Sequence, residues 1–103
     1  MIARGTTPVI RVMYKVVDVS TIDVAYLTIR QGGLTIEKDL QDATVVHSGD
    51  NNYLEWALTQ EETLSLCSNC NVEMQVRCRA NGEAYDSPIN IVPVYKILKE
   101  GVI

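Results

Sequence analysis

The sequence predicts an all-β protein, an immunoglobulin-like antiparallel β-sandwich of about seven strands with one short helical turn before the sixth strand. Turn-forming residues recur at the short intervals typical of such sandwiches, and the segments between them alternate apolar and polar side chains with a period of two. The chain has 103 residues, of which 47% are hydrophobic and 21% are charged, as is typical of a folded globular chain. This length predicts a single domain over residues 1–103.

Four strands are predicted in the first half of the chain. The first is Val9–Val17, whose alternation places four side chains on one inward face: Ile10, Val12, Tyr14 and Val16. Asp23–Gln31 is the second strand, and Gly32-Gly33 after it predicts a two-residue hairpin turn. The third strand begins at Leu34, and the fourth is the short segment Thr44–His47.

The fifth predicted strand, Tyr53–Leu58, carries the only tryptophan of the chain. Because the chain has no phenylalanine, we expect Trp56 to be the largest side chain of the core. Thr59 and Glu62 have the spacing of a capping box, in which each side chain accepts a hydrogen bond from the other residue's backbone N–H. This pattern predicts one helical turn over Gln60–Leu64.

The last two predicted strands flank another tight turn. Val72–Ala80 has the most regular alternation in the chain and predicts a central strand with one solvated face. Asn81-Gly82 predicts a hairpin turn. The final strand runs from Ala84 to Leu98, and because Pro88 and Pro93 lack the N–H that a strand ladder uses, we expect an edge strand or a bulge there.

Charge and hydropathy exclude two classes of partner. Nine Lys and Arg residues against 13 Asp and Glu residues give a net charge of −4, and the basic residues are scattered, with Arg77 and Arg79 as the nearest pair. A nucleic-acid interface needs clustered positive charge, so we expect no nucleic-acid partner. No apolar run approaches the roughly 20 residues that cross a bilayer, so we expect no membrane partner.

The cysteines and the single histidine are the candidates for chemistry. Cys67 and Cys70 form the segment CSNC, whose spacing can hold a metal ion or carry a redox-active pair. Cys78 and His47 could complete a four-ligand zinc set, but Cys78 lies on the apolar face of its strand, as a small core residue would. We therefore expect structural cysteines and an exposed His47, and we expect no cofactor and no catalytic residue. A metal or redox role for Cys67, Cys70, Cys78 and His47 is the alternative.

The outward apolar side chains are the candidates for protein contacts. Val24 and Tyr26 lie on the outer face of the second predicted strand, and Tyr95 belongs to the apolar carboxyl-terminal segment VYKILKEGVI. An uncovered apolar face on a sandwich is typical of an association surface. Exposed tyrosines can also stack on sugars, so a carbohydrate- or host-surface-binding module is the alternative to protein–protein contact.

Four segments of the chain resemble a group of small phage- and prophage-encoded proteins of Firmicutes, commonly gut Clostridia. They are RGTTP at Arg4–Pro8, LTQEETL at Leu58–Leu64, VEMQVR at Val72–Arg77 and VPVYKILKEGVI at Val92–Ile103. The RGTTP start followed by a β domain also resembles the amino-terminal immunoglobulin-like domain of some phage baseplate proteins.

This resemblance implies a non-enzymatic virion structural or assembly protein of the phage tail or baseplate. Its partners would be other phage structural proteins or a second copy of itself, and it would be made in the bacterial cytoplasm and carried into the virion. One departure concerns the usual inter-sheet disulfide of antibody-type domains. The strand expected to face Cys78 carries Ala25, Leu27 and Ile29, so that disulfide has no second cysteine.

Overall fold

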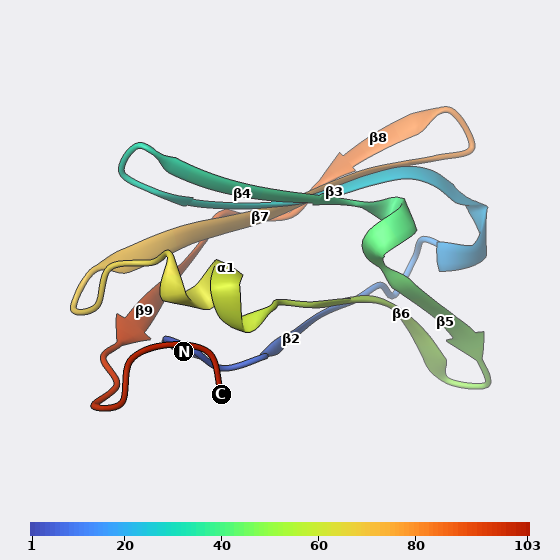
Figure 1. Cartoon of the computed structure of the whole chain (residues 1–103). Coiled ribbons are helices and arrows are strands. Elements are labelled where there is room, and N and C mark those ends of the chain that lie inside the picture. The colour runs from blue at the N-terminus through green and yellow to red at the C-terminus, as the bar shows by residue number, and fades with distance from the viewer.

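The computed structural model describes residues 1–103 and confirms the all-β class, with two β-sheets packed face to face (Figure 1). The strands are β1 (Ile2–Ala3), β2 (Val9–Met13), β3 (Ile22–Gln31), β4 (Leu34–Asp39), β5 (Thr44–Ser48), β6 (Asn51–Ala57), β7 (Asn71–Ala80), β8 (Glu83–Asp86) and β9 (Asn90–Tyr95). Helix α1 (Gln60–Leu64) lies between β6 and β7, and two 3₁₀ turns, η1 (Val19–Thr21) and η2 (Leu40–Asp42), precede β3 and β5.

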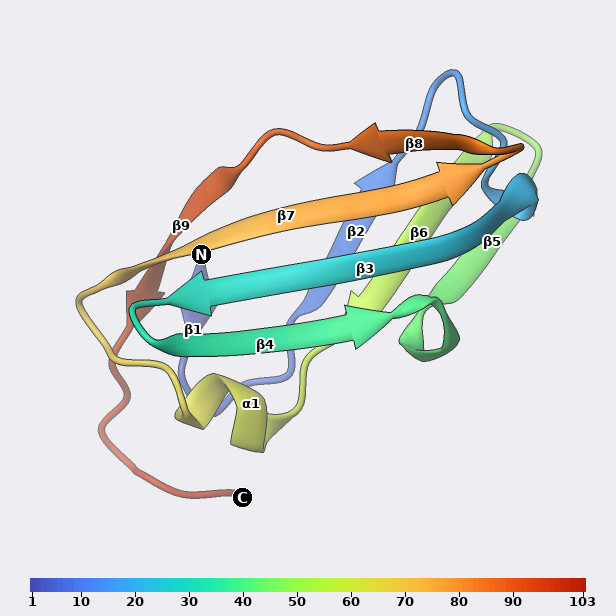
Figure 2. The ribbon, with the colours of Figure 1, turned by 90° about the horizontal axis from the view of Figure 1, so that it is seen from above.

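The two sheets differ in size. The larger has the order β1-β9-β7-β3-β4, with β8 also paired to β7, and the smaller has the order β2-β6-β5. All neighbours are antiparallel except β1 and β9, which run parallel. Seen from above, the strands of the two sheets cross at an angle (Figure 2). The molecule is therefore a β-sandwich with its apolar residues between the two layers.

Two-residue turns connect three of the strand pairs. The predicted hairpins at Gly32-Gly33 and Asn81-Gly82 are confirmed, and Gly49-Asp50 joins β5 to β6 in the same way. Asn81 and Gly82 both have positive φ, 53° and 80°, which is the backbone that the favoured hairpin turn requires. These turns fix the register of each pair.

The strand order differs from the immunoglobulin order. In constant-type immunoglobulin domains the second strand lies between the first and the fifth. Counting β2 as the first strand, the second strand here is β3, which lies between β7 and β4 in the other sheet. A second difference is that β3 and β4, the second and third strands in this count, lie side by side in one sheet, because the two-residue turn at Gly32-Gly33 joins them directly, whereas the second and third immunoglobulin strands lie in different sheets.

Nine strands replace the seven that the sequence predicts. One addition is β1, and the other arises because the predicted strand Ala84–Leu98 is interrupted between β8 and β9. At the interruption Ser87 supplies the hydrogen bonds that a paired strand would give to Val76. The Ser87 N–H donates to the Val76 carbonyl at 2.8 Å, and the Ser87 Oγ accepts from the Val76 N–H at 2.9 Å. Pro88 follows and cannot donate at all, so the chain leaves β7 and returns two residues later.

The first strand is shorter than predicted. β2 ends at Met13, and Val16, which the alternation placed inward, is 95% exposed. The alternation fails because the side chain of Asn52 holds the carbonyls of Tyr14 and Val17 at 2.9 and 2.7 Å, which turns the chain away from the sheet. Val17 packs against the core instead.

The core lies between the two sheets and has Trp56 as its largest fully buried side chain, as predicted. The Trp56 indole N–H donates to the carbonyl of Asp39 at 2.9 Å, which ties β6 of the smaller sheet to the end of β4 in the larger one. Cys78 is buried in this core, as its strand pattern predicts. The expectation that β3 faces Cys78 across the core is wrong, because Ala25 is its neighbour in the same sheet and Tyr14 meets it from the other layer.

The predicted helical turn is confirmed as α1, before the sixth of the predicted strands. Thr59 and Glu62 form the capping box, with the Thr59 N–H donating to Glu62 Oε1 at 2.8 Å and the Glu62 N–H donating to Thr59 Oγ1 at 3.1 Å. None of the helical segments is long and apolar enough to reach across a bilayer.

Candidate functional site

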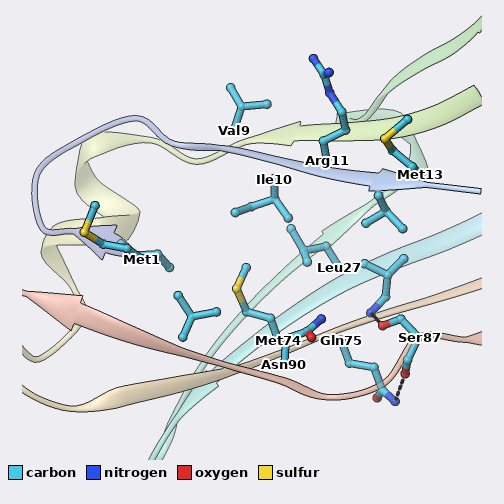
Figure 3. A pocket seen from close by; sticks show the side chains of 14 residues that line it. Met1, Val9, Ile10, Arg11, Met13, Leu27, Met74, Gln75, Ser87 and Asn90 are labelled. Carbon is cyan, nitrogen blue, oxygen red and sulfur yellow. Dashed lines mark hydrogen bonds between the residues drawn. The ribbon is translucent and has the colours of Figure 1, made fainter. Parts of the chain in front are cut away.

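An apolar groove lies on the open side of the sandwich, where β2 and β9 do not pair (Figure 3). Its volume is about 480 Å³, and ten of its 14 lining residues are hydrophobic. The groove is lined by Met1, Ile2, Val9, Ile10, Arg11, Val12, Met13, Leu27, Met74, Gln75, Val76, Ser87, Asn90 and Val92. We call it the β2–β9 groove.

Each wall of the β2–β9 groove comes from a different sheet. Ile10 of β2 points into the groove from one side, and Leu27 and Met74 of the larger sheet approach it from below (Figure 3). Val92 of β9 lines the opposite side, where the polar groups are those of Gln75, Ser87 and Asn90. The Gln75 side chain donates to the carbonyl of Ser87 at 3.1 Å, so this corner is fixed. The groove is thus an extension of the core that remains open to solvent.

Beside the groove, β2 presents an unpaired backbone edge. β2 pairs only with β6, and two bonds show which of its backbone groups point there: the Leu58 N–H donates to the carbonyl of Pro8, and the Tyr14 N–H donates to the carbonyl of Asn52. The backbone N–H and C=O groups of successive residues point to opposite sides of a strand, so those of the even-numbered residues of β2 point toward β6. The N–H and C=O groups of Val9, Arg11 and Met13 therefore face the free edge.

The outer side chains of β2 are mainly apolar. Val9 is 53% exposed and Met13 is 65% exposed. Between them, the Arg11 side chain contacts two residues of the neighbouring strand β6: its guanidinium lies 2.8 Å from Glu55 Oε2 and 4.2 Å from the centre of the Tyr53 ring. An edge strand usually carries free charge or proline against unwanted pairing, and β2 has neither within it.

The interaction residues predicted from the sequence do not gather at one place. Val24 and Tyr26 lie on the outer face of β3, as predicted, but their neighbours across the strands are Arg79 and Arg77, each bound to a carboxylate. Tyr95, 48% exposed, lies at the end of β9 that adjoins the start of β7, whereas Tyr26 adjoins the far half of β7. This outer face is therefore more polar than the sequence suggested.

The candidate metal ligands are also separated. Cys67 and Cys70 lie exposed at one end of β7, and Cys78 is buried eight residues further along it, about 26 Å at about 3.3 Å per residue. No three His, Cys, Asp or Glu side chains come together in a group that could hold a metal ion. His47 is exposed on β5, where its Nδ1 lies 3.1 Å from Asn52 Oδ1 and 3.4 Å from Asp18 Oδ1.

Two of the ionisable groups near these candidates have shifted pKa values. Burial, and then the hydrogen bond that its hydroxyl donates to Cys78 Sγ at 3.6 Å, raise the pKa of Tyr14. Hydrogen bonds from the hydroxyl and N–H of Ser20 lower the pKa of Asp18. Both groups therefore keep their ordinary charge at neutral pH, Tyr14 neutral and Asp18 ionised.

Sequence reasoning missed the β2–β9 groove. The alternation of β2 correctly placed Ile10 and Val12 inward, but alternation does not say that β2 has a neighbour on only one side. The one signal was Pro93 in the final strand: the Val94 N–H bonds to Cys70 beside β7, so the N–H that Pro93 lacks would have faced away from β7.

Comparison of the chain with protein-family models, with curated proteins and with solved structures found no match.

Proposed function

We propose that this chain is a non-enzymatic assembly protein that binds a partner by accepting an extended segment of it along β2 and into the β2–β9 groove. The observation that carries this proposal is the unpaired edge of β2 lying directly beside an apolar groove. Strand addition uses both features, because main-chain hydrogen bonds supply affinity and side-chain pockets supply specificity. The partner segment would be apolar at every second position.

The geometry of the edge favours an extended partner segment. Val9, Arg11 and Met13 offer three N–H and three C=O groups along one line. A strand bound there places alternate side chains on the two faces of the smaller sheet. One set would enter the groove above Leu27 and Met74, and the other would lie on the outer face beside Val9 and Met13.

The resemblance to phage and prophage proteins supplies the setting of the proposal. The partner is a phage tail or baseplate protein, and the chain is made in the bacterial cytoplasm and joins the virion with that partner. Strand addition suits assembly, because it joins two folded proteins through one segment without a large preformed interface.

A proline at Arg11 tests the strand-addition edge. The Arg11 N–H has no partner in the fold, so Arg11→Pro removes a donor only from the free edge, whereas Arg11→Ala keeps that donor and removes the same side chain. Proteins encoded beside the gene are purified and tested singly against the wild type and both variants, with circular dichroism to verify folding. We expect Arg11→Ala to bind within about threefold of the wild type and Arg11→Pro to bind at least about tenfold more weakly.

A second variant tests the groove independently of the backbone edge. Val92→Phe enlarges a side chain on the opposite side of the groove, away from the backbone of β2, and should weaken binding of the same partner by filling the space that the partner's side chains need.

Equal affinity of the two Arg11 variants for the partner would contradict the proposal. So would the failure of every tested neighbour to bind while light scattering shows a monomer over a concentration series.

A further inference from the structure

The segment Cys67-Ser68-Asn69-Cys70 is a tight turn with an exposed cysteine at each end. Ser68 and Asn69 form the turn, and Asn69 has a φ of 60°, a left-handed backbone that Asn tolerates better than most residues. A four-residue turn brings its first and last Cα atoms within about 7 Å. Disulfide-bonded cysteines have Cα atoms about 4.4–6.8 Å apart, so the turn holds the two residues in the range that a disulfide needs.

The backbone of Cys67 is fixed to the end of β3. The side-chain amide of Gln31 binds it twice: the Cys67 N–H donates to Gln31 Oε1 at 2.7 Å, and Gln31 Nε2 donates to the Cys67 carbonyl at 3.0 Å. One side of the turn therefore has a defined position.

The other side of the turn is fixed to β9. The Val94 N–H donates to the carbonyl of Cys70 at 3.1 Å, and the Asn69 N–H donates to the carbonyl of Val94 at 3.0 Å. Both cysteine backbones are thus held by neighbouring strands, while both side chains remain exposed. We therefore expect the two thiols to meet by rotation of their side chains within this turn.

We propose that Cys67 and Cys70 are a reversible dithiol–disulfide pair that a low-molecular-weight disulfide oxidises. The thiolate of one cysteine attacks the small disulfide, which forms a mixed disulfide and releases one small thiolate. The second cysteine then attacks the protein sulfur of the mixed disulfide, which closes the Cys67–Cys70 bond and releases the second small thiolate. The small disulfide is reduced to two thiols, and the two protein thiols are oxidised to one disulfide.

The position of the pair makes the bond reversible. A ring closed over four residues removes little conformational entropy from the unfolded chain, so folding gains little from it. Because the bond is exposed, small thiols can reach it and open it again. Cys78 takes no part, since it is buried in the core at the far end of β7.

Mass spectrometry of the full chain in a glutathione buffer tests the proposal. Trypsin cuts after Lys38 and Arg77, so Cys67 and Cys70 fall in one peptide, residues 39–77, and Cys78 falls in another, residues 78–79. After incubation with glutathione disulfide, we expect residues 39–77 to be lighter by two hydrogen atoms, and added reduced glutathione should restore the original mass. Residues 78–79 should retain a free thiol in both conditions.

The single variants Cys67→Ser and Cys70→Ser are the matched controls. Each keeps one exposed thiol and should stop at the mixed disulfide, with the mass of one glutathione added, because the second nucleophile is missing. The proposal would be overturned if the wild type also stopped at mixed disulfides, if residues 39–77 were linked to residues 78–79 or to a second chain, or if both thiols stayed free in glutathione disulfide.

Discussion

At the scale of single residues, the side chain of Asn52 fixes the course of the chain after β2. Its Nδ2 donates to the carbonyls of Tyr14 and Val17, and its Oδ1 accepts from the N–H of Val19 at 3.0 Å. Three backbone groups that leave the sheet thus find partners on one amide. The segment between β2 and β3 depends on this residue more than on any regular secondary structure.

Replacing Asn52 should therefore lower the stability of the fold more than replacement of a partly exposed polar residue usually does. Asn52→Ala leaves three backbone groups without their partner, and at about 1 kcal/mol each we expect the free energy of unfolding to fall by about 2–3 kcal/mol. Asn51→Ala is the control, because Asn51 is an exposed neighbour on the same strand. Urea unfolding followed by Trp56 fluorescence measures both, and equal losses would contradict the role given to Asn52.

Val16 tests the corrected facing of the first predicted strand, and the buried Leu54 of β6 serves as the comparison. Leu54 is fully buried, so Leu54→Ala should lower the free energy of unfolding by about 2–5 kcal/mol. Val16 is almost fully exposed, so Val16→Ala should change it by less than about 0.5 kcal/mol. A loss of more than about 1 kcal/mol for Val16→Ala in the same urea experiment would restore the inward position that the alternation suggested.

At the scale of elements, α1 is held by its cap and by a charge on the neighbouring sheet. Lys38 Nζ of β4 lies 2.9 Å from Glu62 Oε1, the same oxygen that accepts from the Thr59 N–H. Burial alone would raise the pKa of Glu62, but the hydrogen bond from Thr59 and the charge of Lys38 outweigh it, so the pKa is lowered from its ordinary value of 4.5. The ionised form of Glu62 therefore stabilises the folded state.

Acid should weaken this cap in a defined direction. Because the pKa of Glu62 is lower in the folded chain, its contribution is complete above about pH 4.5 and is lost as the pH falls through the folded value. Glu62→Gln keeps a capping oxygen but loses the charge, so we expect a loss of about 0.5 kcal/mol at neutral pH and a weaker dependence of stability on pH below 4.5. Glu62→Ala also loses the cap and should cost about 1 kcal/mol. Unfolding curves from pH 3 to 7 test this, and identical acid dependence in the wild type and Glu62→Gln would contradict it.

Local elements were predictable where the chemistry is local. The turns at Gly32-Gly33 and Asn81-Gly82 and the capping box of Thr59 and Glu62 follow from contacts within a few residues, and the structure confirms them. The end of β2 was not predictable, because it depends on Asn52, more than 30 residues away. The interruption at Ser87 likewise depends on Val76 of the neighbouring strand.

At the scale of the whole molecule, the two sheets leave one side of the sandwich open. β9 and β2 belong to different sheets and do not pair, so no strand closes the sandwich on this side. The core residues Leu27 and Met74 therefore adjoin a groove. The sequence predicted the sandwich from its alternation, but the sheet edges follow from strand order, which alternation does not encode. For the same reason the sequence points to Val24, Tyr26 and Tyr95 as contact residues, whereas the contact proposed from the structure runs along β2.

The exchange of backbone amide hydrogens along β2, measured with and without the bound partner, tests strand addition most directly. In the free chain the amides of Ile10 and Val12 should exchange slowly, because they are bonded to β6, and those of Val9, Arg11 and Met13 should exchange fast. Binding of the partner should slow these three as well. Partner binding that leaves the three amides fast would contradict strand addition at β2.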